Sequence, residues 1–314
     1  MGAVSRKLIS IVIPLYNEEG NVDELARRLQ AVFAENLGYD FEVIAVENGC
    51  EDSTLEKLLA VRKDDSRFKI LQLARNFRMD GGLTAGLQHA AGDAAVLMTA
   101  DLQDPPELIT RFIEKWEDGF DSVAMIVTKR EGTGLLRRFN SQLFYWLINV
   151  MTGGNFPRNV SDFRLVDRKV YQVINSMNER NRFVRGMFFW AGFKSTGIEH
   201  PRPPRFAGES KADTLKVIEL ALKGILSFSV FPLRIITWTG VTVSVVAFML
   251  LVYEVVKAIF FGVPFAGFGS IMSVMLLMFG FLFVMLGVVA EYIGLIYEEV
   301  KQRPNFVVRE KIGL

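Results

Sequence analysis

The residues best suited to chemistry in this sequence form an acidic turn behind an apolar, strand-like run. Asp101, Gln103 and Asp104 bring oxygen donors together. Mg²⁺ and Mn²⁺ suit such a turn, because hard ions are held by one or two carboxylates plus substrate phosphates. The same turn is a good helix start, with Asp104 as cap and Glu107 at the third helical position. Asp101 is not needed for capping, so a metal site and a helix cap both remain open and are compatible.

Two further polar clusters lie downstream. The first is Ser161-Asp162-Phe163-Arg164, and the second, residues 202–211, reads RPPRFAGESK and holds three cations. The second cluster is either a solvated basic loop or a phosphate clamp beside a membrane, since Arg offers paired donors to phosphate. The residues alone leave both interpretations open.

The elements that must position these clusters alternate between strand and helix. Strands are expected at 8–15, 41–46, 69–73 and 94–99, and helices at 21–35, 53–61 and 80–91. This alternation predicts an α/β fold with a mostly parallel sheet covered on both faces. Ligands in such folds bind beyond the carboxyl ends of the strands. The turns after the first, second and fourth strands are therefore the expected site.

Two familiar phosphate-binding classes are excluded by their missing motifs. No G-x-G-x-x-G turn follows the first strand, as a Rossmann dehydrogenase requires, and no Walker A sequence occurs. The Gly81-Gly82 pair opens a helix and could approach a phosphate closely, although alone it is a weak signal. Ser53 is expected to cap its helix, with Glu56 completing a capping box.

Composition limits the partners and the compartment. The net charge is +1, from 36 basic and 35 acidic residues, so no nucleic-acid partner is expected. A single cysteine, Cys50, excludes an internal disulfide and fits a reducing compartment. The apolar stretch 8–16 runs into acidic residues without a cleavage site, which indicates a strand and not a signal peptide.

Long uncharged runs near the carboxyl end predict a membrane anchor. Residues 235–253 and 258–290 carry no charge, and a glycine- and proline-containing turn at 262–269 interrupts the second run. We expect transmembrane helices at about 233–260 and 269–296, since a span needs ~20 apolar residues. Lys and Arg flank both helices but are absent from the connecting loop, so the positive-inside rule places both termini in the cytoplasm. A hydrophobic core hairpin is the alternative, and runs this long argue against it.

These features divide the chain into four expected parts. They are a cytoplasmic domain at 1–211, an amphipathic juxtamembrane helix at 212–229, a two-helix transmembrane anchor at 230–298 and a cytoplasmic tail at 299–314. Residues 135–151 and 212–228 are basic and amphipathic. Such helices lie in a membrane interface or pack against a core, and the pattern alone leaves both open.

Five ordered motifs resemble one family across nearly the whole chain. They are SIVIPLYNEEGNVDEL (10–25), EVIAVENG (42–49), ARNFRMDGGLTAGLQHAAGD (74–93), TADLQDPPE (99–107) and SDFRLVDRKV (161–170). The sequence resembles the polyprenyl-phosphate glycosyltransferases of glycosyltransferase family 2, a group that includes dolichol-phosphate mannose synthase. RPPRFAGESK, followed by two apolar spans, is similar to the bactoprenol glucosyltransferase branch.

The resemblance implies a GT-A (Rossmann-like) nucleotide-sugar domain and a defined reaction. We expect inverting transfer of a single sugar, glucose from UDP-glucose, to polyprenyl (undecaprenyl) phosphate at the cytoplasmic membrane face. GDP-mannose or another UDP-sugar is the alternative donor. A non-catalytic, membrane-tethered nucleotide-sugar binding protein is the alternative of another class. A processive synthase normally carries Q-x-x-R-W, and residues 142–146 (QLFYW) lack the Arg.

The resemblance also assigns residues to roles. Asp101 and Gln103 would hold Mg²⁺ or Mn²⁺ with the donor diphosphate. Asp101, Asp162 and Arg164 would be the catalytic residues, the latter two beside the sugar and acceptor. The nucleotide sugar would be bound by Pro14, Tyr16, Asn17, Glu19, Glu47, Asn48 and Asp101. The acceptor phosphate would be bound by Arg202, Arg205, Ser210 and Lys211.

The sequence departs from the family pattern at two places. The usual Asp-Asp-Gly-Ser after the second strand is Glu47-Asn48-Gly49-Cys50, and Thr99 stands where the family often has an Asp. These departures put nucleotide binding and metal affinity in question.

The expected reaction needs no strong base, because the attacking phosphate oxygen is already anionic at neutral pH. His89 and His200 are accordingly read as structural. Glycines at 280, 287 and 294 share a helix face and suggest a homo-oligomer. The short uncharged loop offers no translocation path, so a separate flippase and a downstream transferase are the expected partners.

Overall fold

A computed structural model describes residues 6–130, 159–203, 206, 231–261 and 267–314. The chain divides into two compact units. The first comprises Met1–Glu219 together with Arg303–Leu314, and the second comprises Leu220–Gln302. The two amphipathic segments predicted at 135–151 and 212–229 lie outside the described residues.

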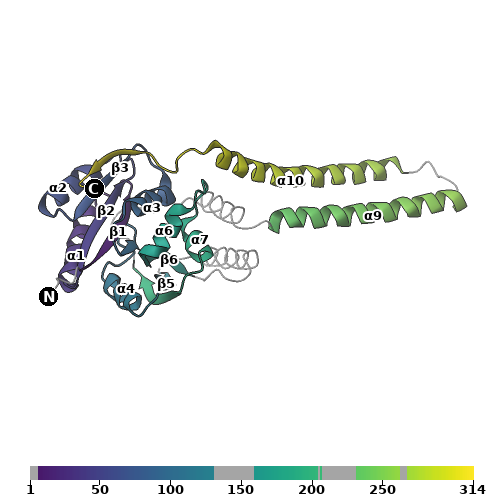
Figure 1. Ribbon diagram of the computed structural model, residues 1–314. Helices are drawn as coiled ribbons and strands as arrows, with labels where there is room; N and C mark the ends of the chain where they lie inside the picture. The colour runs from purple at the N-terminus through teal and green to yellow at the C-terminus, as the bar shows by residue number, and fades with distance from the viewer. Residues whose placement is uncertain (1–5, 131–158, 204–205, 207–230, 262–266) are drawn as a thin grey trace. The chain divides into compact units, whose positions relative to one another are not determined.

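The first unit is built on one mixed sheet (Figure 1). Its strand order is β7-β5-β6-β4-β1-β2-β3-β8. The central strands β4, β1, β2 and β3 are parallel, whereas β6 runs antiparallel to β4 and β5, and β8 antiparallel to β3. The strands are β1 Lys7–Leu15, β2 Tyr39–Glu47, β3 Phe68–Leu73, β4 Ala94–Leu97, β5 Ser122–Arg130, β6 Val160–Asp167, β7 Ser195–Arg202 and β8 Val308–Ile312. The predicted α/β fold with a mostly parallel sheet is confirmed.

Helices cover both faces of this sheet because its central strands are apolar on both sides. Along β1, Ile9, Ile11 and Ile13 pack with α1, α2 and α4, while Val12 faces α3. Alternate residues of a strand point to opposite faces, so a run of β-branched residues suits a doubly covered position. The helices are α1 Val22–Glu35, α2 Thr54–Asp64, α3 Arg78–His89, α4 Leu108–Glu117, α6 Arg168–Ser176 and α7 Val184–Trp190.

The glycines of α3 let that helix lie close to the sheet. A Cβ at Gly86 would come within 2.2 Å of Val12 Cγ1, and one at Gly82 within 2.8 Å of Pro14 Cβ. The Gly81-Gly82 pair, which in the sequence could approach a phosphate, therefore has a packing reason at Gly82.

The second unit contributes two long helices, α9 Phe231–Phe261 and α10 Phe268–Lys301. They contain the helices expected at 233–260 and 269–296. Among the described residues, one helical stretch, Leu277–Lys301, is long and apolar enough to cross a membrane, and the apolar stretch Ile236–Leu250 of α9 is shorter.

The carboxyl-terminal tail returns to the first unit. Its strand β8 pairs with β3, and the Ala74 N–H donates to the Val307 carbonyl at 2.9 Å just before it. Asn305 Nδ2 donates to the Glu179 carbonyl at 3.1 Å, and the Phe306 ring meets His89 edge-on. The segment expected as a cytoplasmic tail thus supplies an edge strand of the sheet.

Candidate active site

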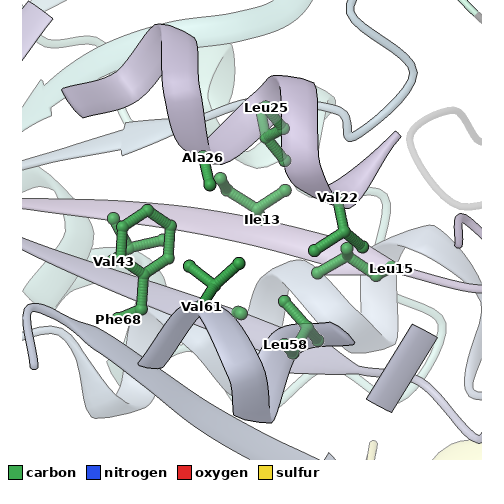
Figure 2. Close-up of a pocket in the computed structure, with 10 residues that line it drawn as sticks. Ile13, Leu15, Val22, Leu25, Ala26, Val43, Leu58, Val61 and Phe68 are labelled. Carbon is green, nitrogen blue, oxygen red and sulfur yellow. The ribbon is translucent and has the colours of Figure 1, made fainter. Parts of the chain in front are cut away.

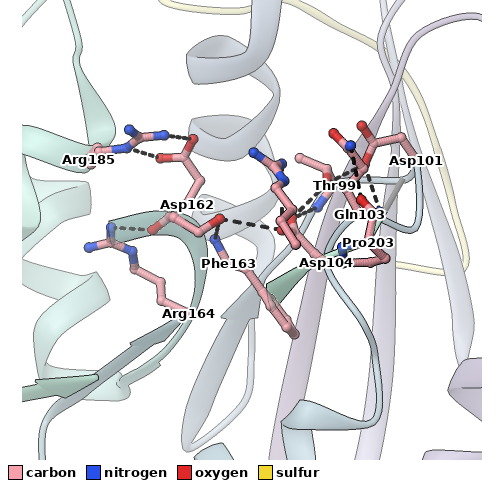
Figure 3. Close-up of polar contacts among 11 residues, drawn as sticks. Thr99, Asp101, Gln103, Asp104, Asp162, Phe163, Arg164, Arg185 and Pro203 are labelled. Carbon is pink, nitrogen blue, oxygen red and sulfur yellow. Dashed lines mark hydrogen bonds and ion pairs between the residues drawn. The ribbon is translucent and has the colours of Figure 1, made fainter. Parts of the chain in front are cut away.

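The predicted polar clusters meet where the carboxyl end of β4 lies beside the amino end of the antiparallel strand β6 (Figure 3). Strand β4 ends at Leu97 and leads into the turn Thr99–Asp104, while β6 carries Asp162 and Arg164. The Ser161 hydroxyl donates to Asp104 Oδ1 at 3.4 Å and joins the two clusters. Because β4 ends and the antiparallel strand β6 begins at this edge of the sheet, residues some sixty positions apart lie together.

Thr99 organises the acidic turn. Its hydroxyl lies 2.7 Å from both Asp101 Oδ1 and Asp104 Oδ2, and its N–H donates to Asp104 Oδ2 at 3.0 Å. Leu102 adopts a left-handed conformation (φ 57°), and the Gln103 N–H donates to Asp101 Oδ1 at 3.3 Å. The turn therefore orients the Asp101 carboxylate from within.

Asp104 is a buried structural carboxyl and not the predicted helix cap. It is completely buried, and burial raises its pKa although Arg202 opposes the shift. Helix α4 begins at Leu108 behind Glu107, which makes no side-chain capping bond. The cap prediction was wrong because Asp104 turns inward to Thr99. Ser53 occupies the predicted N-cap position of α2, but the predicted capping bond was wrong, since its side chain makes none and Asp52 Oδ1 accepts from the Thr54 N–H instead.

The oxygen atoms of this turn suit a divalent ion that takes its remaining ligands from the substrate. Asp101 is 6% exposed and offers a carboxylate, and Gln103 Nε2 donates to the Pro203 carbonyl at 3.2 Å, which fixes its side-chain amide. Within the described ranges no group of three or more His, Cys, Asp or Glu forms a ready-made metal cage. One carboxylate and one amide oxygen suit Mg²⁺ or Mn²⁺ whose other ligands are phosphate oxygens.

Asp162 lies at the centre of a cationic cluster (Figure 3). Arg185 Nε donates to Asp162 Oδ1 at 2.7 Å, and Arg185 Nη2 donates to Oδ2. Burial raises the pKa of Asp162, but the charges of Arg185, Arg164 and Arg202 outweigh it and hold this pKa below its usual value. Asp162 is therefore a carboxylate at neutral pH.

Arg164 is the most deeply buried cation of the cluster. It is 2% exposed, its Nη2 donates to the Ser161 carbonyl at 3.0 Å, and its guanidinium lies 4.8 Å from the centre of the Phe188 ring. Burial lowers the pKa of Arg164 to about 10, so it keeps its charge at neutral pH. Arg164 thus supplies fixed positive charge behind Asp162.

Glu47 keeps one acceptor atom without a partner. Glu47 is 2% exposed, and its Oε1 accepts from the Cys50 N–H, whereas its Oε2 is buried without a hydrogen bond. Asn48 is fully engaged, because Phe77 N–H donates to its Oδ1 at 2.9 Å and its Nδ2 donates to the Arg78 carbonyl at 2.9 Å. An unpartnered buried carboxylate oxygen is costly unless a ligand donates to it.

The other residues predicted for the nucleotide brace neighbouring turns. Asn17 Oδ1 accepts from the Glu51 N–H at 2.8 Å, and Glu19 Oε2 accepts from the Ser53 N–H at 3.0 Å. Pro14 lies beneath Gly82, and Tyr16 directly follows β1. The bonds made by Asn17 and Glu19 join the turn after β1 to the turn after β2. Contact of these residues with a nucleotide stays a prediction.

Of the predicted acceptor residues, one lies among the described residues. Arg202 ends β7, its Nη2 is 3.8 Å from Asp104 Oδ1, and its Nε is buried without a partner. Arg205, Ser210 and Lys211 lie outside the described residues.

Sequence reasoning missed Arg185 and Asp80, which the fold brings to Asp162. The available signal was an isolated charge, Arg185, in the otherwise apolar run of 183–190.

A separate apolar gap takes no part in this site (Figure 2). It lies between the sheet and helices α1 and α2, and ten apolar residues line it. They are Ile13, Leu15, Val22, Leu25, Ala26, Val43, Ala45, Leu58, Val61 and Phe68. With no polar group to orient a ligand, the gap belongs to the hydrophobic core.

Taken together, an α/β sheet with an acidic turn, an unpartnered Glu47 oxygen and a cluster of arginines at one edge defines a nucleotide-sugar transferase type of site. The family profile "Glycosyl transferase family 2" matches residues 10–174, a range that includes Asp101 and Asp162. The chain belongs to glycosyl transferase family 2 and is a transferase.

Relatives match over nearly the full length. The chain is 40% identical to "Uncharacterized glycosyltransferase sll0501" of Synechocystis over 98% of this chain and 96% of the relative. It is 37% identical to "Bactoprenol glucosyl transferase" of Shigella phage SfII over 96% and 97%. A "Prophage bactoprenol glucosyl transferase homolog" of Escherichia coli is 38% identical over 96% and 98%. The chain is also similar to a solved glucosyl-3-phosphoglycerate synthase of Mycobacterium tuberculosis, at 17% identity over 71% of this chain and 80% of that one, with a TM-score of 0.49.

Proposed function

We propose that this protein transfers one glucosyl residue from UDP-glucose to polyprenyl phosphate at the cytoplasmic face of a membrane, with inversion at the sugar carbon. The observation that carries the proposal is the convergence of the Asp101 turn with the arginine cluster around Asp162 at one sheet edge. The names of the bactoprenol relatives supply the acceptor class and the sugar.

The reaction joins two anions, and each side of the site suits one of them. An acceptor phosphate oxygen attacks the anomeric carbon, the bond from that carbon to the donor diphosphate breaks, and its electron pair leaves with the diphosphate. No proton has to be removed from the nucleophile. Arg202 and Arg164 reduce the repulsion between the anions, because fixed cations in a partly dry site act strongly on them.

Asp101 and Gln103 would hold the divalent ion, with Thr99 fixing the Asp101 carboxylate. When bound, such an ion neutralises charge on the leaving diphosphate. The role we assign to Glu47 Oε2 is to accept a hydrogen bond from the ribose or base of the donor. Asp162 orients the sugar or the acceptor.

The proposed membrane anchor has two spans, α9 and α10. Strands β7 and β8, which lie before and after the two long helices in the sequence, belong to the same folded unit, and this supports a chain that leaves and returns on one side of a membrane. The number of crossings is then even. Because α10 contains a stretch long enough to span, α9 supplies the return crossing. The absence of Lys and Arg from residues 262–269 supports a cytoplasmic location of both termini.

Cysteine labelling tests this orientation. In a Cys50→Ser background, Ala266→Cys is expected to react in intact cells with a membrane-impermeant maleimide. Gly38→Cys, at an open position of the catalytic domain, should react only after permeabilisation. Protection of Ala266→Cys in intact cells would contradict the two-span topology.

The activity is tested on membranes with separately labelled UDP-glucose and GDP-mannose. With polyprenyl phosphate, UDP-glucose should transfer one labelled sugar into the lipid extract, and Asp101→Asn should abolish the transfer. Lipid labelling from GDP-mannose alone would overturn the donor assignment, and a labelled polymer would indicate a synthase. No transfer from any nucleotide sugar despite donor binding would favour a binding protein.

The oligomer, the flippase and the downstream transferase also remain proposals. In α10 a Cβ at Gly280, Gly287 or Gly294 would meet no atom of the described residues within 4 Å, which suits a face that packs against another helix. Crosslinking in native membranes tests the homo-oligomer.

A further inference from the structure

Arg185 and Asp162 form a two-point ion pair at the edge of the site. Arg185 Nε and Nη2 each donate to a different oxygen of Asp162, the former at 2.7 Å. A guanidinium that holds both oxygens fixes the rotation of the carboxylate as well as its position. The two side chains remain 26% and 30% exposed, so the pair is still accessible to a substrate.

The helix that carries Arg185 is anchored independently of this pair. The Val184 N–H donates to Asp80 Oδ1 at 3.0 Å, which ties the start of α7 to α3. Phe188, one turn further, packs beneath the Arg164 guanidinium of β6, and Met187 is buried. Arg185 is thus presented from a backbone held on two sides, as expected for a group that positions another side chain.

Asp162 keeps hydrogen-bonding capacity after this pair is made. Each carboxylate oxygen accepts more than one hydrogen bond, and Arg185 takes one at each oxygen. The remaining acceptor sites suit sugar hydroxyls, which are neutral donors and do not compete with the guanidinium.

We propose that Arg185 is a positioning residue for sugar transfer, one that holds the Asp162 carboxylate in the orientation in which it accepts a hydrogen bond from a hydroxyl of the transferred sugar. The inference rests on the proposed function, because it requires Asp162 to act on the sugar or acceptor. In this role Arg185 acts through Asp162, and we assign it no contact with the leaving diphosphate or the acceptor phosphate.

The charges around Asp162 make the proposal testable by pH. Arg185 faces it from α7, Arg164 from β6, Arg202 from β7 and Asp80 from α3, with Arg182 near Asp80. Burial raises the pKa of Asp162 and the arginines lower it. Removing the charge at 185 therefore raises this pKa, and activity should begin to fail at a higher pH than in the wild type.

The experiment compares Arg185→Gln and Arg185→Lys in the full-length protein in membranes. Arg185→Gln should lower kcat at least ~10-fold, leave both KM values within about threefold and move the acid limb of the kcat profile to higher pH. Arg185→Lys should restore the acid limb but not kcat, because an ammonium keeps the charge without the two-point contact. If Arg185→Gln does not fold, the Lys variant alone tests the proposal. A lower kcat with the acid limb of the pH profile unchanged would then support it.

Controls separate the possible failures. Arg67→Gln removes a similar two-point pair, with Asp65, outside the site and should leave kcat unchanged. Wild-type kcat and pH profile in both Arg185 variants would overturn the inference, as would a rise in acceptor KM alone, which would make Arg185 a phosphate ligand. Full activity of Asp162→Asn would instead remove the role that the proposed function gives Asp162.

Discussion

Thr99 donates to Asp104 Oδ2 twice, from its backbone N–H at 3.0 Å and from its hydroxyl at 2.7 Å. Asp104 has no exposed surface, so these bonds replace water that the carboxyl cannot reach. The same hydroxyl reaches Asp101 Oδ1. Where the family often has a carboxylate, this chain has a residue that joins the carboxyls of the turn to each other.

Replacing Thr99 by Val should lower the affinity for the metal ion more than the stability of the fold. The shape is kept, but Asp101 and Asp104 lose the Thr99 hydroxyl that they share, at a cost of about 1–3 kcal/mol for the buried group. We expect a lower melting temperature and several-fold more Mn²⁺ for half-maximal activity. Thr110→Val, at the hydroxyl that accepts from Asn36, should not change the Mn²⁺ requirement. An unchanged requirement in Thr99→Val would contradict the role of Thr99.

Glu47→Gln should separate stability from donor binding. The substitution replaces a buried carboxylate oxygen that has no partner, so the melting temperature without substrate should not fall. A hydrogen bond to a charged group contributes about 1.5–3 kcal/mol, so the KM for UDP-glucose should rise about 10- to 100-fold. Exposed Glu56→Gln on the following helix serves as control. The assignment fails if the donor KM of Glu47→Gln equals that of wild type.

The parallel half of the fold could be predicted because its signals are local. Residues 8–15 and 41–46 are apolar runs of strand length followed by helical spacing, and they became β1 and β2. The site turn could be found for the same reason, since Asp101 and Gln103 directly follow a strand.

The antiparallel strands and the Asp162 cluster depend on contacts that no local pattern encodes. Strand β6 pairs with β4 from about seventy residues away, and β8 pairs with β3 from the far end of the chain. Asp104 looked like a cap because its neighbours favour one, and burial against Thr99 overrode that preference. Arg185 meets Asp162 because α7 packs beside β6.

Stability should fall with rising pH through the titration of Asp80. Burial raises its pKa from 3.8 to about 6, so the folded state binds this proton more tightly than the unfolded chain. The resulting stabilisation is complete below about pH 4 and is lost as pH rises through about 6, a difference of about 1–3 kcal/mol. Asp80→Asn, which can still accept from the Val184 N–H, should raise the melting temperature at pH 7.5 and flatten its change between pH 4 and 7. A lower melting temperature throughout that range would contradict this account.

Removing β8 should destabilise the catalytic unit without a specific loss of donor affinity. Deletion of residues 307–314 removes the hydrogen bonds between β3 and β8 from the outer edge of β3. It also uncovers the part of the hydrophobic core that Ile312 covers beside Ile70. An unpaired edge strand invites pairing with other chains, so we expect a lower melting temperature and aggregates in detergent by size-exclusion chromatography. Deletion of 313–314 alone keeps the strand and is the matched control. If the longer deletion melts and elutes like wild type, β8 does not stabilise the sheet. The KM for UDP-glucose of the remaining folded fraction should stay near the wild-type value, because Glu47 lies on β2, one strand inside the exposed edge.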